Sequence, residues 1–166
     1  MKFILASSSP RRRDLLFRLQ TPFDIILPDV NESMIIADGS PETYCNTLAE
    51  LKANDISQHY PNELVIGADT IVFLIDEILG KPDDKAAAEH MLQTLSGKTH
   101  QVYTGVCLKW TEKNIHHLFA EITTVTFRNL DDRDIAHYIE SCPPYDKAGA
   151  YGIQDWSAVF VKEIRG

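Results

Sequence analysis

Seven residues near the amino terminus combine hydroxyl groups with guanidinium groups, in the order Ser7-Ser8-Ser9-Pro10-Arg11-Arg12-Arg13. We expect a helix to begin at Pro10, because serine is a favoured N-cap and proline suits the first helical position. The amide groups and dipole of a helix N-terminus attract anions, and arginine offers paired donors to phosphate. Ser7, Ser9, Arg11 and Arg12 are therefore candidate phosphate ligands, although a capped surface helix with solvated arginines would share this pattern. The GxxxxGK[ST] phosphate loop does not occur in the chain.

Acids and lysines recur at other breaks in the chain. Asp69, in Gly67-Ala68-Asp69-Thr70, follows an apolar run, and an acid at a strand end commonly points into a ligand crevice. Holding a turn would be its alternative role. Lys81 lies between Gly80 and Pro82, and Lys147 opens a segment of small residues that ends at Gln154. Glycine in such segments allows a ligand to approach the backbone closely.

Glu32 and Lys52, each taken alone, are indistinguishable from solvated surface charges. Together with the residues above they fit one task, because cations clamp phosphate oxygens and carboxylates bind divalent metal or activate water. Spacing in the sequence does not show whether these groups converge.

The composition limits the classes of protein to which the chain could belong. Its 166 residues carry a net charge of −8 and 44% hydrophobic residues, typical of a single globular domain and unfavourable for a broad nucleic-acid surface. The three cysteines have no zinc-binding spacing, so we expect free thiols in a cytoplasmic protein. No apolar run is long enough to span a membrane, and the amino terminus does not resemble a secretory signal.

Hydrophobic periodicity and turn residues predict the elements that must position these groups. Helices are expected from Pro10 to before Thr21, from Pro41, over 83–95 and over 131–141. Strands are expected at 2–6, 23–27, 64–67, 70–75, 100–110, 116–127 and 158–164. Residues 29–40 are expected to form a polar loop. Alternation of strands and helices, followed by a long hairpin, indicates an α/β or α+β fold with a mixed sheet.

Five blocks of the sequence resemble the signatures of the Maf (septum formation inhibitor-like) family, and they occur in the family's order. They are Leu5-Ala6-Ser7-Ser8-Ser9-Pro10-Arg11-Arg12, Gly67-Ala68-Asp69-Thr70, Gly80-Lys81-Pro82, residues 95–106 (LSGKTHQVYTGV) and residues 146–154 (DKAGAYGIQ). The resemblance implies a nucleoside triphosphate pyrophosphatase with an inosine-triphosphatase-like fold and a central groove. It also implies a divalent metal, Mg²⁺ or Mn²⁺, and frequent homodimers. Neither a stable nucleic-acid complex nor a membrane partner is expected.

The resemblance also assigns roles to individual positions. Asp69 matches the proton acceptor, and Glu32, Lys52 and Lys81 match the family's other catalytic residues, with Glu32 and Asp69 as metal ligands. Arg12, Thr70 and Gln154 match the positions that select the base, and their combination resembles the branch that acts on dTTP and UTP. The implied task is the removal of excess or noncanonical pyrimidine nucleotides. A nucleotide-binding regulator of cell division without turnover is the alternative.

Two features depart from the family pattern. Asp155 and Trp156 follow Gln154, where the family usually has glycine first. The chain also ends at Gly166, without the Asn-Val-Val-Gly-Leu-Pro-like stretch and closing helix that the family usually carries, so we expect one Maf-like domain over 1–166 that lacks this last element.

Overall fold

The computed structural model describes residues 2–35 and 40–166, and these divide into two compact units. The first unit contains residues 1–69 and 104–121, and the second contains residues 70–103 and 122–166. Part of the predicted loop, residues 36–39, lies outside the described residues. Three strands have residues in both units: β3 (Leu64–Leu74), β5 (Thr99–Trp110) and β6 (Ile115–Phe127).

The described strands form a mixed sheet, as the sequence predicts. Hydrogen-bonded neighbours follow the order β2-β1-β3-β5-β6-β7, and β4 pairs with β3. Strand β1 (Phe3–Ala6) lies parallel to β2 (Phe23–Ile25) and β3, whereas β4 (Glu77–Leu79) and β7 (Val161–Arg165) pair antiparallel to β3 and β6. Parallel and antiparallel pairs in one sheet confirm the predicted α/β class.

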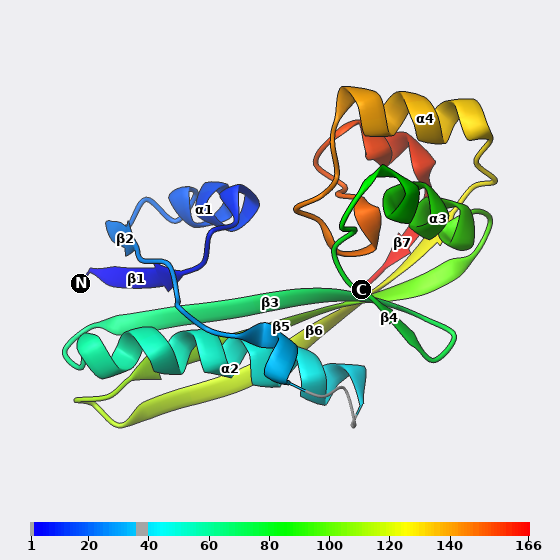
Figure 1. The fold of residues 1–166 in the computed structure, drawn as a ribbon. Helices are drawn as coiled ribbons and strands as arrows, with labels where there is room; N and C mark the ends of the chain where they lie inside the picture. Colours follow the sequence, from blue (N-terminus) through cyan, green and yellow to red (C-terminus); the bar gives the residue numbers. More distant parts are fainter. Residues whose placement is uncertain (1, 36–39) are drawn as a thin grey trace. The chain divides into compact units, whose positions relative to one another are not determined.

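Helix α2 (Pro41–His59) covers one face of the strands of the first unit (Figure 1). Ala49, Ala53 and Ile56 of this helix pack with Ile4 and Val65 of the strands. The approach is close because Gly67 has no side chain: a Cβ there would lie 2.3 Å from the Ala49 carbonyl oxygen. Small residues on both elements therefore bring the backbone of α2 almost onto β3.

Helix α1 (Pro10–Phe17) begins where the sequence predicts, with the Ser9 hydroxyl accepting a hydrogen bond from the Arg12 amide. It ends at Phe17, and Gln20 then adopts a φ of 53°. None of its residues is fully buried, although Arg12 is partly buried, and both Leu15 and, beyond the helix end, Leu19 are exposed. Its apolar residues therefore add little to the core of the described chain.

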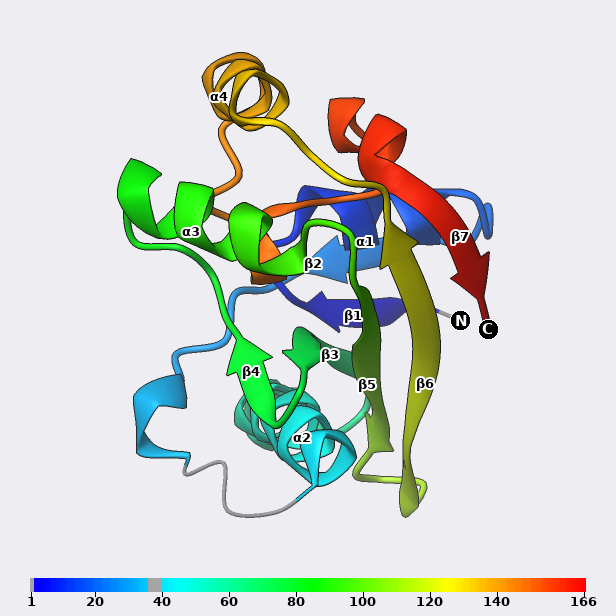
Figure 2. The same cartoon turned by 90° about the vertical axis from the view of Figure 1, so that its right-hand side faces the viewer.

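The core of the second unit lies beneath α3 (Lys85–Leu95) and α4 (Asp132–Ser141), which Figure 2 shows coloured green and gold. Leu92 and Leu95 of α3 pack with Ile135, Tyr138 and Ile139 of α4. Asp84 and Asp131 cap these helices by accepting hydrogen bonds from backbone amides. No helix within residues 2–35 and 40–166 is long and apolar enough to cross a membrane.

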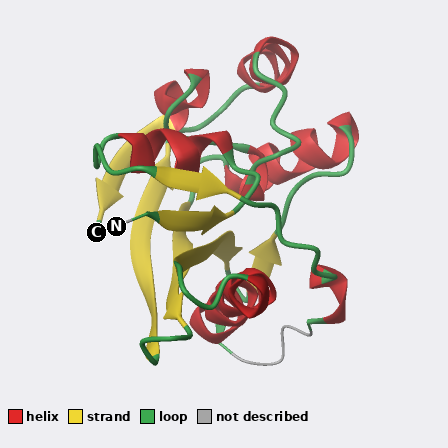
Figure 3. Cartoon of the chain, turned by 90° about the vertical axis from the view of Figure 1, so that its left-hand side faces the viewer, coloured by secondary structure: helices red, strands yellow, loops and turns green. Residues whose placement is uncertain are grey.

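Several predicted boundaries are wrong. The predicted strands 64–67 and 70–75 form one strand, β3, which continues through Asp69 and ends at Leu74. Figure 3 shows the strands of the mixed sheet in yellow. The short strand β4 was not predicted. The last strand begins at Val161, because Asp155 caps a 3-10 helix over Trp156–Phe160. The polar loop contains another 3-10 turn, Glu32–Met34.

Candidate active site

A buried lysine joins two of the predicted acids in the first unit. The Lys52 Nζ atom lies 2.5 Å from Asp69 Oδ1 and 3.0 Å from Glu32 Oε1. The side chains of Lys52 and Asp69 are only 8% and 12% exposed, whereas that of Glu32 is 45% exposed. Three residues that are far apart in the sequence thus form one cluster, with one ammonium between two carboxylates.

The local fold explains how these groups meet. Lys52 lies on the sheet-facing side of α2, one residue before Ala53, and the close packing on Gly67 brings its side chain to β3. Cys45, two turns earlier, donates from Sγ to the Asp69 carbonyl oxygen at 3.3 Å and accepts from the Gly105 amide at 3.0 Å. Both the main chain and the side chain of Asp69 are therefore tied to α2.

Arg12 reaches the same stretch of β3 from α1. Its Nη1 atom donates to Ser7 Oγ at 3.0 Å and to the Ala68 carbonyl oxygen at 2.8 Å. Burial lowers the pKa of Arg12, while the negative charge of Asp69 opposes this change. The guanidinium is thus held at the main chain of Ala68, the residue before Asp69, and the charge of Asp69 acts on it. The half-buried Arg11 follows Pro10 in the first turn of this helix.

The remaining predicted residues belong to the second unit. Thr70 is half-buried and is the next residue after Asp69 on β3, whereas Lys81 and Gln154 are exposed. The Gly149 amide donates to the Gly80 carbonyl oxygen at 2.9 Å, which links the Lys81 loop to the segment 146–154. Sequence blocks that are more than sixty residues apart are thus neighbours within this unit.

Lys147 lies in a network that the sequence does not reveal. Its Nζ atom is 2.9 Å from Asp146 Oδ1 and 3.5 Å from Asp155 Oδ2, and its side chain is 12% exposed. Asp155 Oδ1 accepts hydrogen bonds from the amide and the hydroxyl of Ser157, at 3.0 and 2.7 Å. Asp155, the residue that departs from the family pattern, is therefore in contact with Lys147, a predicted substrate-binding lysine.

A second unpredicted pair anchors the same segment. His100 Nε2 lies 2.7 Å from the Tyr151 hydroxyl, and Phe127 packs edge-on against both rings. Burial lowers the pKa of His100 to about 4 and raises that of Tyr151. His100 is therefore neutral near pH 7. Only the fold shows that His100 is buried and that Tyr151 is its partner.

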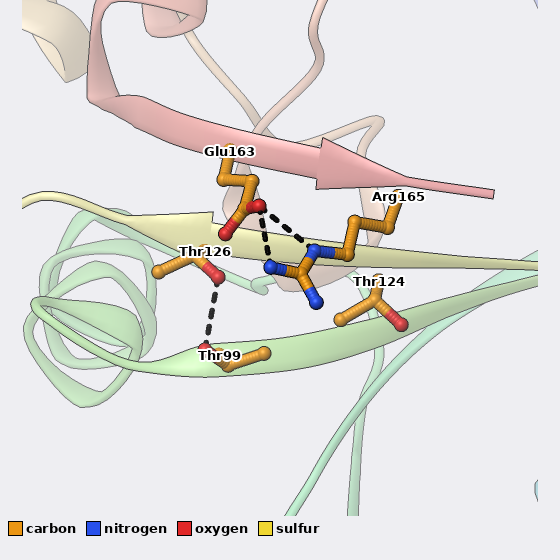
Figure 4. A pocket seen from close by; sticks show the side chains of 5 residues that line it. All are labelled: Thr99, Thr124, Thr126, Glu163 and Arg165. Carbon is orange, nitrogen blue, oxygen red and sulfur yellow. Dashed lines mark hydrogen bonds and ion pairs between the residues drawn. The ribbon is translucent and has the colours of Figure 1, made fainter.

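Two surface pockets are lined by other residues. One, of about 160 Å³, is formed by side chains of β5, β6 and β7: Thr99, Thr124, Thr126, Glu163 and Arg165 (Figure 4). The other, of about 290 Å³, lies near the turn between β5 and β6 and includes Glu50, Trp110 and His116. None of the predicted site residues lines either pocket, so pocket volume does not locate the candidate site.

The described residues contain no group of three or more His, Cys, Asp or Glu side chains arranged to hold a metal ion. Asp69 and Glu32 nevertheless converge on one cationic group, Lys52 Nζ. This donor set fits Mg²⁺, which typically takes one or two protein carboxylates and completes its shell with water and substrate phosphates.

The sequence matches a known protein family over almost its whole length. The profile of the family described as "Maf-like protein" matches residues 2–166. The chain belongs to the Maf family.

Individual relatives agree with this assignment. A Bacillus cytotoxicus protein named dTTP/UTP pyrophosphatase is 48% identical over 165 residues, which cover 99% of this chain and 85% of that protein. Proteins of the same name from Ruminiclostridium cellulolyticum and Clostridium kluyveri are each 45% identical, covering 98% and 100% of this chain and 84% and 88% of theirs. The relatives' shared name is that of an enzyme and gives no support to a regulator without turnover.

A solved structure supports the predicted fold. The Ham1 protein of Staphylococcus aureus superposes with a TM-score of 0.53 over 76% of this chain and 72% of that chain. The two sequences are 14% identical over this region, so the likeness concerns the fold alone.

Proposed function

We propose that the protein hydrolyses dTTP and UTP to the nucleoside monophosphate and pyrophosphate. The observation that carries the proposal is the Glu32–Lys52–Asp69 cluster, held beside Arg12 in a chain of the Maf family. The relatives named dTTP/UTP pyrophosphatase support the choice of substrates.

In this reaction a water oxygen attacks the α-phosphorus and the bond from that phosphorus to the bridging oxygen of the β-phosphate breaks. Asp69 accepts the proton of the water, and pyrophosphate leaves with the bridging oxygen. Lys52 fixes the orientation of the Asp69 carboxylate through their 2.5 Å ion pair. A positioned base of this kind typically contributes ~10²–10⁴ in rate.

Mg²⁺ or Mn²⁺ is the proposed cofactor, with Asp69 and Glu32 as its protein ligands. When bound, a divalent cation neutralises phosphate charge and lowers the pKa of the attacking water. The exposure of Glu32 supports this role, because an accessible carboxylate can exchange its contact with Lys52 for one with a metal. We assign Lys81 and Lys147 to the phosphates, because cationic side chains clamp phosphate oxygens. Arg12, Thr70 and Gln154 are assigned to base selection, the role that the Maf resemblance predicts for these three positions.

Pyrophosphate release from a panel of nucleoside triphosphates tests this proposal. With magnesium, we expect dTTP and UTP to yield monophosphate and pyrophosphate, and chelation to abolish the reaction. The variant Asp69→Asn should lose ~10²–10⁴ in turnover while still binding nucleotide. Asp24→Asn is the control, because Asp24 lies on strand β2 of the same unit and its side chain pairs with Lys2 at the surface.

Three outcomes would contradict the proposal. Release of orthophosphate would place cleavage at the terminal phosphate. Equal rates of pyrophosphate release with and without chelator would show that no metal takes part in the reaction. Near wild-type turnover by Asp69→Asn would show that another acid accepts the proton, and Glu32 would be the first candidate.

A further inference from the structure

Asp155 is fixed on both of its oxygens within the second unit. Oδ1 accepts two hydrogen bonds from Ser157, and the Ser157 hydroxyl lies 2.8 Å from the Gly152 carbonyl oxygen. Oδ2 lies 3.5 Å from Lys147 Nζ and accepts a long hydrogen bond, also 3.5 Å, from the Tyr138 hydroxyl. The carboxylate is therefore held in one orientation, with one oxygen facing Lys147.

The path of the Lys147 side chain is equally restricted. A Cβ built on Gly152 would lie 3.2 Å from Lys147 Cδ and 3.3 Å from Cε, so the aliphatic stem passes closely over this glycine. Its end then lies between Asp146 and Asp155. One positive and two negative charges give this cluster a formal sum of −1, since Lys147 contributes +1 and the two acids −1 each.

We propose that Asp155 is a positioning residue that weakens triphosphate binding by holding the Lys147 ammonium in an internal ion pair. This inference rests on the proposed function, in which Lys147 binds phosphate. A phosphate oxygen must displace a carboxylate from Lys147 and approach the negative charge of Asp155, and both steps oppose binding. Glycine, the usual family residue at this position, would have neither effect.

Replacement of the charge with little change in shape gives the clearest test. Asp155→Asn keeps an acceptor for Ser157 but removes the negative charge. We expect the KM for dTTP to fall about two- to fivefold, the effect expected for one partly exposed ion pair, with kcat within about twofold of wild type. Asp155→Gly, which introduces the family residue, should lower KM in the same direction. The difference in KM between these variants and wild type should decrease at high salt, because salt screens exposed charges.

Two controls separate this role from a general effect of charge or folding. Asp132→Asn makes the same change in net charge on the exposed first turn of α4 and should leave KM unchanged. In a Lys147→Met background, Asp155→Asn should no longer lower KM, because its effect passes through Lys147. A purely structural role of Asp155 would not depend on the residue at 147.

The inference is overturned if both Asp155→Asn and Asp155→Gly leave KM unchanged or raise it, or if the decrease persists with Met at 147. Calorimetric binding of inorganic pyrophosphate to wild type and to both variants gives a second measurement that requires no turnover. If wild type releases no pyrophosphate from dTTP, the proposed function fails. Tighter pyrophosphate binding by the variants would then still support the inference, and unchanged binding would overturn it.

Discussion

Removing the ammonium from the buried cluster should destabilise the protein strongly. In Lys52→Met the side chain stays unbranched and loses only its terminal nitrogen position, but Asp69, whose side chain is 12% exposed, loses its 2.5 Å partner. Breaking a buried ion pair from one side typically costs about 3–5 kcal/mol, because the remaining charge stays buried. For a chain of this size, 1 kcal/mol shifts Tm by about 2–4 °C, so we expect a decrease of about 6–20 °C.

A double-mutant cycle tests whether the unpaired charge is the cause. Lys52→Met combined with Asp69→Asn removes both charges and should recover more than about 1 kcal/mol relative to the sum of the single changes. The measurement is thermal or urea unfolding followed by circular dichroism at pH 7. The Lys2–Asp24 pair is a control, since its atoms are also 2.5 Å apart but both side chains are more than half exposed. Lys2→Met should leave Tm unchanged.

Two results would refute this reasoning. Additive effects of the two changes at Lys52 and Asp69 would mean that the charges do not interact in the folded protein. Equal decreases in Tm for Lys52→Met and Lys2→Met would mean that burial does not determine how much an ion pair contributes to stability.

Three further predictions follow from the described contacts. Because burial lowers the pKa of His100 from 6.5 to about 4, the unfolded chain binds the additional proton first, and stability should fall as pH decreases from about 6.5 toward 4. His100→Gln should reduce that acid sensitivity in Tm measured across this range, and an unchanged slope would contradict the assignment. Gly67→Ala should cost about 1–3 kcal/mol or more in urea unfolding, whereas Gly80→Ala, where a Cβ meets nothing within 4 Å, should cost far less; equal losses would disprove the packing argument. Arg12→Ala should narrow the ratio of kcat/KM between UTP and CTP if Arg12 selects the base, whereas an equal loss on both would assign it to the phosphates.

The order of elements could be predicted well because local signals govern it. Ser9-Pro10, Pro41 and Asp131 mark helix starts that the structure reproduces. The break predicted around Gly67 was wrong for a tertiary reason. This glycine serves the approach of α2, and the strand continues through it.

The contacts of individual site residues could not be predicted from the sequence. Glu32 and Lys52 looked like surface charges, because nothing local shows that α2 packs tightly enough on β3 to bury Lys52 beside Asp69. Asp155 was visible as a departure from the family pattern, but its contact with Lys147 depends on the return of the chain at Gly152 and Ser157. Sequence motifs thus predicted the roles of these residues, whereas their contacts depend on how the elements pack.

The bare backbone at Gly67 has a consequence for how sequence motifs of this protein are interpreted. Glycine beside a catalytic acid is usually attributed to room for substrate or to flexibility. Here the missing side chain leaves space for the Ala49 carbonyl and the Ala53 amide of α2, and Gly105 does the same for the Cys45 carbonyl. Any side chain at either position would push away the helix that carries Lys52. These two glycines therefore set the distance between a helix and a sheet, and a substitution that does not touch the nucleotide would still displace Lys52 from Asp69.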